Sequence, residues 1–379
     1  MTKIIQEYID QQKSIQKGIL GFINHNVGEK VYYLNLLKVL DDPSIHKSQS
    51  ELSTTLRLLL DLANNHHRMP DFFKKIEQIL IIFKDDIKQN FSNFDLFNIC
   101  KKNKEILLIL LENKMLEFDQ SIIDIITETK FLQLRYPYYF SPECQSFNID
   151  SKILLEIQTK MTDANKEGPE AFDKKRKAGE NSLRYCQYIR EDSLEDFISY
   201  VNEHKLPLST VIEPSIFETN NFLIQKTPTL IEYAAFFGSM RVLNYLLENN
   251  VQMPPSIWLY AIHSRSMDLL HLIEEKKVQP NDQSYNECFI EAVKCHHIEM
   301  SEYFKTVYLH NQIPNDPSVT SQIIKFRNYL YFPSDLSTPS NFYDLSKYDY
   351  YKIVDFLLTH VANIDTNRRV ILEIVSFCK

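Results

Sequence analysis

The sequence predicts an all-α protein, folded as a helical solenoid of stacked helix-turn-helix repeats. The first observation is a pair of short apolar helical patterns in residues 229–251, which meet at Gly238-Ser239. The second is recurrence, because the same residue classes return 27 and 58 positions later, as they do in repeat proteins. The third is length: helix pairs this short cannot bury their apolar sides alone, so each must pack against its neighbours. The matching positions are Ile231, Ala234, Val242, Leu243, Tyr245 and Leu246, then Trp258, Ala261, Leu269, Leu270, Leu272 and Ile273, then Phe289, Ala292, Met300, Ser301, Tyr303 and Phe304.

These copies resemble the ankyrin repeat. The residues in register with the family pattern are Thr229, Ile231, Ala234, Ala235, Gly238, Val242, Leu243, Leu246 and Leu247, with His297, Glu299 and Met300 in a later copy. The stretches 189–201 and 214–239 are also similar to a divergent ankyrin-like family that is abundant in trichomonad protists and has no assigned activity. The resemblance covers residues ~170–365 and is strongest at 227–305. It implies the fold but no chemistry.

The sequence departs from the family pattern in its turns. Leu230 replaces the turn proline and Glu232 replaces the histidine, while Arg265, His296 and Asp349 stand where glycine would be. The resemblance therefore implies the helix pairs more firmly than the regular finger loops of the family.

The N-terminal half is expected to be a degenerate helical repeat region, residues 1–165. Apolar periodicity predicts two helices with a bend over residues 1–42, interrupted at Gly18, Gly21 and Gly28, then helices at ~51–65, ~71–88 and 120–129. Residues 93–114 form a degenerate repeat, because shifting the central copy by 136 positions aligns their second helix but not their first. The proline-containing stretch 136–142 is expected to be a loop.

The C-terminal half, residues 166–379, is expected to be the ankyrin-like repeat region. The polar stretch 160–182 is the candidate boundary, and Pro169 should open a helix that runs to Ile189. Residues 204–228 are too long for a normal connection, so a structured insertion is expected there. The remaining expected elements are a short helix near 322–330, a last copy at about 340–365 and a final helix at 370–377.

Composition limits the functional classes. The net charge of −8 argues against a nucleic-acid binder, which needs clustered cations. The longest apolar runs are far too short for a membrane span, and the N-terminus lacks the apolar block of a signal peptide. The six cysteines show no CxxC spacing, so we expect reduced thiols and a cytoplasmic protein.

Catalytic and cofactor motifs do not occur in this sequence. It contains none of the hydrolase, zinc-protease, P-loop or kinase patterns, so we expect no enzyme activity and no cofactor. Cys288, Cys295, His296 and His297 invite a zinc site, but their spacing does not match the paired spacing of structural zinc ligands. By register, the two histidines fall in an interhelical turn, where they can bond backbone groups. We expect no metal.

One basic run stands out: Lys174, Lys175, Arg176 and Lys177. It is compatible with a nuclear-import signal, which would make the location nuclear, or with a dock for an acidic partner. The favoured interpretation is a solvated helix start with acidic residues nearby.

The candidate binding residues lie on the first helices of the repeats. In the ankyrin pattern, the residues flanking the alanine pair face the concave side of the solenoid, and here they include four aromatic residues and a histidine. Such side chains provide large contact areas at little entropic cost, which suits a bound peptide or helix. The alternative is that Phe236 and Phe237 pack against the 204–228 insertion. The candidates are Tyr233, Phe236, Phe237, Tyr260, His263 and Lys294.

The functional expectation is a non-enzymatic scaffold or adaptor that binds a protein partner on its concave face. One alternative is a structural or self-assembling protein that uses aromatic helix faces as subunit contacts, and another is an enzyme with an unrecognised site. The pattern also predicts that Trp258 is core and that Ala234 and Ala261 are close-packing positions between repeats.

Overall fold

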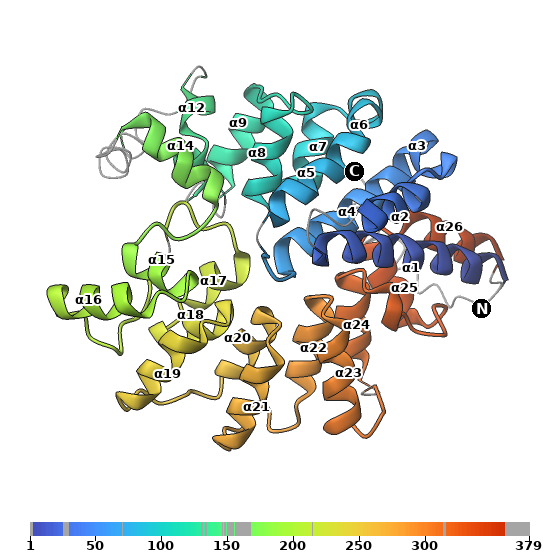
Figure 1. Ribbon diagram of the computed structural model, residues 1–379. Helices are drawn as coiled ribbons and strands as arrows, with labels where there is room; N and C mark the ends of the chain where they lie inside the picture. The colour runs from blue at the N-terminus through green and yellow to red at the C-terminus, as the bar shows by residue number, and fades with distance from the viewer. Residues whose placement is uncertain are drawn as a thin grey trace. The chain divides into compact units, whose positions relative to one another are not determined.

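The computed structural model describes residues 3–25, 30–69, 71–129, 132, 135–145, 147, 149, 155, 168–213, 215–313 and 316–360. Over these residues the chain forms 24 α-helices, one short 3-10 helix and no β-strand, which confirms the all-α prediction (Figure 1). Extended pairing within this part of the chain is limited to an isolated bridge between Val211 and Thr229.

The chain divides into two compact units. The first unit comprises residues 1–62, 66–76 and 280–379, and the second comprises residues 63–65 and 77–279. The first unit therefore combines described helices from before residue 77 with described helices from after residue 279. The boundary expected at 165–166 lies outside the described residues.

The described part of the second unit contains four helix pairs. α7 pairs with α8, α15 with α16, α18 with α19 and α20 with α21, while the leading helices α15, α18 and α20 stack in chain order. The helices are α6 (Lys84–Asn90), α7 (Asn93–Cys100), α8 (Lys104–Glu112), α9 (Gln120–Glu128), α11 (Tyr136–Tyr139), α12 (Ser141–Cys144), α14 (Pro169–Ala178), α15 (Arg184–Arg190), α16 (Leu194–His204), α17 (Asn221–Lys226), α18 (Leu230–Phe237), α19 (Met240–Glu248), α20 (Ile257–Ser264) and α21 (Met267–Glu275).

The first unit combines N-terminal and C-terminal helices. α22 pairs with α23 and contacts α24, α25 pairs with α26, and α1 packs on both α2 and η1. The contact between α1 and η1 does not follow chain order. The elements are α1 (Lys3–Asn24), α2 (Lys30–Leu40), α3 (Pro43–Lys47), α22 (Asn286–Lys294), α23 (Ile298–Val307), α24 (Pro317–Lys325), η1 (Tyr329–Tyr331), α25 (Pro339–Lys347) and α26 (Tyr351–His360), with α4 (Gln49–Asn65) and α5 (Phe72–Ile82) contributing to both units.

The turns inside four helix pairs, α18–α19, α20–α21, α22–α23 and α25–α26, share one backbone conformation. Gly238 has a φ of 69°, and the residues 27, 58 and 111 positions later, Arg265, His296 and Asp349, have φ values of 58°, 56° and 65°. All four therefore lie in the left-handed region that normally favours glycine. The departures from the glycine of the family pattern thus change the residue but not the geometry.

Backbone hydrogen bonds close these turns in the same way. The amide of Ser239 donates to Ala234 and that of Gly238 to Ala235, at N–O distances of 2.9 and 3.2 Å. These are the paired bonds of a Schellman motif, which satisfies the last carbonyls of a helix. The same pair of bonds recurs in two other turns: the His297 and His296 amides donate to Ala292 and Val293, and the Tyr350 and Asp349 amides donate to Leu345 and Ser346. In the remaining turn, the Arg265 amide donates to Ile262, which is the bond equivalent to that from Gly238 to Ala235.

The second helices also end alike. Lys114, Asn250 and Lys277 have φ values of 56°, 63° and 57° and stand at the positions that the offsets of 136 and 27 align. α7 and α8 are thus a helix pair that ends like the central ones, although the apolar pattern of α7 had degenerated. The three residues predicted to lie in the core do so: Trp258, Ala234 and Ala261 are fully buried.

Several local expectations need correction. The helix opened by Pro169 ends at Ala178 rather than Ile189, because Gly179 adopts a left-handed φ of 65°, and α15 starts anew at Arg184. The stretch 136–142, expected to be a loop, forms the short helices α11 and α12. α1 continues without interruption through Gly18 and Gly21.

The 204–228 insertion contains α17, as expected. The short helix expected near 322–330 begins earlier, as α24 (Pro317–Lys325), and ends at Lys325, with η1 following at Tyr329–Tyr331. The helix expected at 370–377 lies outside the described residues.

Candidate functional site

The aromatic residues predicted to face a partner are largely buried. Tyr233, Phe236, Tyr260 and His263 expose 1%, 5%, 3% and 1% of their surfaces, whereas Phe237 is half-buried. These four side chains form the interior of the second unit around α18 and α20.

The insertion supplies the side chain that covers this cluster. The Phe222 ring of α17 lies 4.2 Å from the His263 ring, 4.9 Å from the Tyr260 ring and 6.0 Å from the Phe236 ring, measured between centroids. The insertion thus packs on Phe236, which is the arrangement that the alternative interpretation describes. The length of the 204–228 segment was the only sequence signal for it.

A half-buried arginine, Arg190, anchors the hydroxyl of the buried Tyr233. The Arg190 guanidinium donates to the Tyr233 hydroxyl at 2.9 Å and pairs with the Glu180 carboxylate at 2.8 Å. Burial raises the pKa of Tyr233, an effect that the nearby Arg190 charge opposes. The hydroxyl therefore stays protonated and serves as a fixed acceptor. No sequence pattern pointed to Arg190.

Lys294 belongs to the first unit. It lies half-buried on α22, with its ammonium 2.8 Å from the Glu291 carboxylate. Burial acts to lower the pKa of Lys294, but the Glu291 charge outweighs it, and the pKa lies above its ordinary value. Lys294 is a paired cation at neutral pH.

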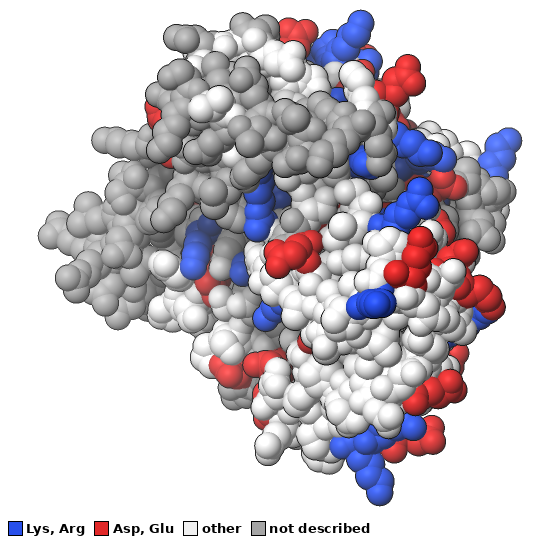
Figure 2. Space-filling model, turned by 90° about the vertical axis from the view of Figure 1, so that its left-hand side faces the viewer, with Lys and Arg blue, Asp and Glu red and all other residues white. Residues whose placement is uncertain are grey.

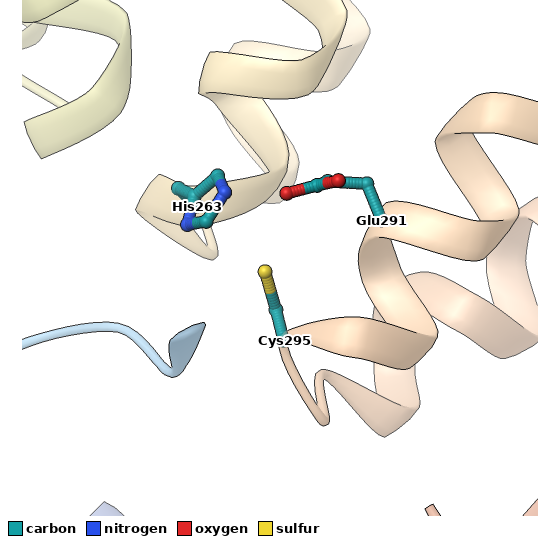
Figure 3. A group of neighbouring side chains, drawn as sticks. All are labelled: His263, Glu291 and Cys295. Atoms are coloured by element: carbon teal, nitrogen blue, oxygen red, sulfur yellow. The ribbon is translucent and has the colours of Figure 1, made fainter. Parts of the chain in front are cut away.

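Figure 3 shows Glu291 and Cys295 at the end of α22, together with His263 from α20. His263 belongs to the second unit, and the other two residues belong to the first. Burial raises the pKa of the Cys295 thiol well above its ordinary value. That thiol is accordingly a poor source of a thiolate.

The adjacent histidines lie where the register predicted, in the α22–α23 turn. His296 and His297 expose only 2% and 1% of their surfaces. His297 Nε2 accepts the backbone N–H of His67 at 3.2 Å, so this histidine does bond a backbone group. The Nδ1 atom of His296 lies 2.8 Å from Gln16 Nε2.

The basic run was interpreted as a solvated helix start, but it lies toward the C-terminal end of α14 and is partly internal. Arg176 is buried and pairs with Glu143 and Asp173 at 2.8 and 3.2 Å. Lys177 pairs with Glu112 at 2.9 Å. No sequence pattern pointed to Glu112 or Glu143 as partners of this run.

The Lys174 side chain is exposed and that of Lys175 half-exposed. In the view of Figure 2, basic and acidic side chains are interspersed rather than gathered into one continuous basic patch.

The first unit contains a cleft of about 520 Å³. On its wall, the buried Glu51 carboxylate pairs with the Lys352 ammonium at 2.9 Å, and the same ammonium lies 4.5 Å from the Tyr8 ring centroid. The Glu51 carboxylate and the Lys352 ammonium therefore form an ion pair within the wall of the cleft. The lining residues are Pro43, Ser44, Ser48, Ser50, Glu51, Tyr351, Lys352 and Asp355.

In comparisons with protein-family models, curated proteins and solved structures, no match to the chain was found. What the structure defines is a class: an all-α protein built of paired short helices. Among the described residues, no helix is both long and apolar enough to cross a membrane.

Proposed function

We propose that the protein is a non-enzymatic scaffold or adaptor that binds a protein partner through an ankyrin-like array of helix pairs. The observation that supports this most is the recurrence of one left-handed turn at Gly238, Arg265, His296 and Asp349. Holding this conformation with arginine, histidine and aspartate costs about 1 kcal/mol per residue relative to glycine. That the left-handed conformation recurs despite this cost supports a structural repeat, and repeat arrays commonly serve as binding surfaces.

The proposed contact residue is Phe237. It is the half-exposed member of the aromatic cluster, and its ring lies 4.8 Å from Tyr233 and 5.0 Å from Phe236. A partly exposed aromatic ring held rigid by buried rings loses little entropy on binding. In this proposal Tyr233, Phe236, Tyr260 and His263 support the surface from beneath rather than touch the partner.

The test is affinity purification of the full chain, comparing the unaltered protein with Phe237→Ala. A matched control is Phe94→Ala, because Phe94 is a 48% exposed phenylalanine on α7 of the same unit. The emission of Trp258 reports whether each variant is folded. We expect a partner that Phe94→Ala retains and Phe237→Ala loses. If both variants capture the partner equally, Phe237 is not part of the interface. If the unaltered protein captures no specific partner, the proposed scaffold function is wrong.

A cytoplasmic location is part of the proposal. The five described cysteines are free thiols, which is typical of reducing compartments. The exposed Lys174 and half-exposed Lys175 leave nuclear import as the alternative, with localisation of a Lys174→Ala, Lys175→Ala variant as the test.

Self-assembly is the second candidate function, favoured by α2. Val31 and Leu34 expose 65% and 48% of their surfaces, and only Leu36 and Leu40 of this apolar helix are buried. Sedimentation at increasing concentration separates the candidates, because an assembler associates by itself and Leu34→Glu should then dissociate it. An adaptor stays monomeric without its partner.

A further inference from the structure

In the first unit, polar contacts join the α22–α23 turn to the N-terminal segment of the chain. Gln16 of α1 reaches His296, and the loop that follows α4 reaches His297. The three side chains are 0%, 2% and 1% exposed, so water does not compete for these bonds. Which atom carries each hydrogen therefore decides whether the contact holds.

The protonation state of His296 can be traced from the Val293 carbonyl, through Asn328 and Gln16, to the imidazole. The Val293 carbonyl can only accept, so the Asn328 amide nitrogen donates to it at 2.8 Å. The Asn328 amide oxygen then accepts from Gln16 Nε2 at 2.9 Å. The same Gln16 nitrogen directs its second hydrogen toward His296 Nδ1 at 2.8 Å. His296 Nδ1 must thus carry a lone pair, and the imidazole is neutral.

The state of His297 follows from an unambiguous donor. The His67 backbone amide can only donate, so His297 Nε2 must also carry a lone pair. Next to it, His66 Nδ1 donates to the Cys295 carbonyl at 2.7 Å, and the His66 and His297 ring centroids are 4.7 Å apart. A proton on His297 Nε2 would point at the His67 N–H, which is itself a donor, and would place a positive charge beside the His66 ring.

We propose that the α22–α23 turn is an acid-sensitive latch: protonation of His296 and His297 turns both acceptors into donors and releases the N-terminal segment from the C-terminal helices of the first unit. Each protonation replaces a buried hydrogen bond with two opposed N–H groups. An unpaired buried polar or charged group is strongly unfavourable, so the open arrangement, in which water solvates both imidazoliums, is preferred in acid.

The direction of the pH dependence agrees with the surroundings of His296. Burial lowers its pKa from an ordinary 6.5 to about 4, and the smaller influence of the Phe326 backbone opposes this. A histidine pKa lowered in the closed state means that closure is fully favoured above pH 6.5 and weakens as the pH falls toward 4.

Other titratable groups belong to the same interface. The charged and titratable groups on the elements packed here are His66 beside His297, the Lys294–Glu291 pair on α22, and the pairs Arg327–Asp61, Arg57–Asp349 and Lys352–Glu51 that join N-terminal to C-terminal residues. The test must distinguish these from the latch histidines.

The experiment is hydrogen–deuterium exchange on the full chain at pH 7 and pH 4.5, corrected for the intrinsic pH dependence of exchange. For a single histidine with the pKa values of His296, opening of α1 should become roughly fiftyfold more frequent at the lower pH. Helices α18 and α20 serve as the internal reference. Acceleration confined to α1 and residues 66–69 is expected.

The decisive variant is His296→Asn with His297→Gln. Asparagine places its amide oxygen near Nδ1 and glutamine near Nε2, so both acceptors survive without a titratable group, and asparagine tolerates the positive φ of residue 296. The control is His271→Gln, which removes a 57% exposed histidine on α21. The double variant should lose the acid acceleration and the control should keep it.

Three outcomes overturn the latch. One is acceleration that persists in the double variant, which would assign it to the carboxylates. Another is equal acceleration of α18 and α20, which is global acid unfolding. The third is no acceleration in the unaltered protein. If the double variant is unfolded at pH 7, His296→Asn and His297→Gln alone carry the test, and each must reduce the acceleration.

Discussion

The two units are held together by different means. In the second unit, α15, α18 and α20 stack in chain order around buried rings such as Tyr233, Phe236 and Trp258. In the first unit, residues from the two ends of the chain meet through buried amides, histidines and ion pairs, as in the contact of Gln16 with Asn328, 312 residues away. Periodic apolar packing thus builds one unit, and specific polar pairing closes the other.

The difference has a physical consequence. Apolar contacts between neighbouring helices tolerate small shifts, because their free energy follows buried area rather than direction. Buried polar contacts are directional, and removing one partner leaves the other unsatisfied. We therefore expect single substitutions at the polar closure of the first unit to have larger effects than comparable changes in the stack.

The largest effect is expected for Arg327→Ala in the first unit. The Arg327 guanidinium is buried, pairs with Asp61 at 2.9 Å and donates to the Tyr348 carbonyl at 2.5 Å. Its loss takes the buried cation away from the half-buried Asp61 carboxylate and the donor away from the Tyr348 carbonyl, which should destabilise the protein by about 3–5 kcal/mol. Chemical denaturation followed by circular dichroism measures this. The control is Lys3→Ala, whose partner Glu7 is 66% exposed, and a similar small effect of both substitutions would contradict the polar-closure model.

The next effect is expected for Gly179→Ala in the second unit. Gly179 has a φ of 65°, and a Cβ atom there would lie 2.5 Å from a carboxylate oxygen of the buried Glu105. Strain and displacement together should cost about 3 kcal/mol. Gly238→Ala is the matched comparison, because its Cβ would meet Ser264 at 3.4 Å, and only about 1 kcal/mol is expected. Equal losses in thermal melting would show that the Glu105 contact does not matter.

Overpacking the stack should have an intermediate effect. Ala261 is fully buried on α20, which packs against α18, so Ala261→Leu should cost about 2 kcal/mol. Trp258 fluorescence measures it directly: the emission should be blue-shifted in the folded protein and shift to the red on unfolding. A loss as large as that of Arg327→Ala would erase the proposed difference between the units.

The smallest effect concerns the left-handed turns, where substitution by glycine should stabilise the two units by different amounts. Arg265→Gly relieves an unfavourable φ of 58° and should stabilise the second unit by a few tenths to about 1 kcal/mol. Asp349→Gly relieves a φ of 65° but also removes the 3.0 Å ion pair with Arg57. Differential scanning calorimetry should show a gain for the first substitution and a smaller gain, or none, for the second.

Local sequence patterns were sufficient to predict those features that depend on residues close together in the chain, such as core and turn positions. The alignment of Ile231 with Trp258 and Phe289 placed all three in the core, where each is at most 1% exposed. The positions equivalent to Gly238 were identified although they hold other residues, because the apolar residues on either side set the register. The pattern of 93–114 likewise identified the α7–α8 pair.

The same patterns could not show what covers a helix face. Phe236 and Tyr260 occupy positions that face a partner in the ankyrin pattern, yet here Phe222 packs over them. Nothing in a 3.6-residue period distinguishes a face open to solvent from one covered by an insertion.

By itself, the sequence determined the helical class, the repeat register and the residues that form the core of each pair, since these depend on contacts a few turns apart. Only the tertiary structure decided that the chain closes on itself within the first unit. Gln16 meets His296 across 280 residues and His67 meets His297 across 230. Such pairings leave no periodic trace, because each is a single directional bond between residues brought together only by folding.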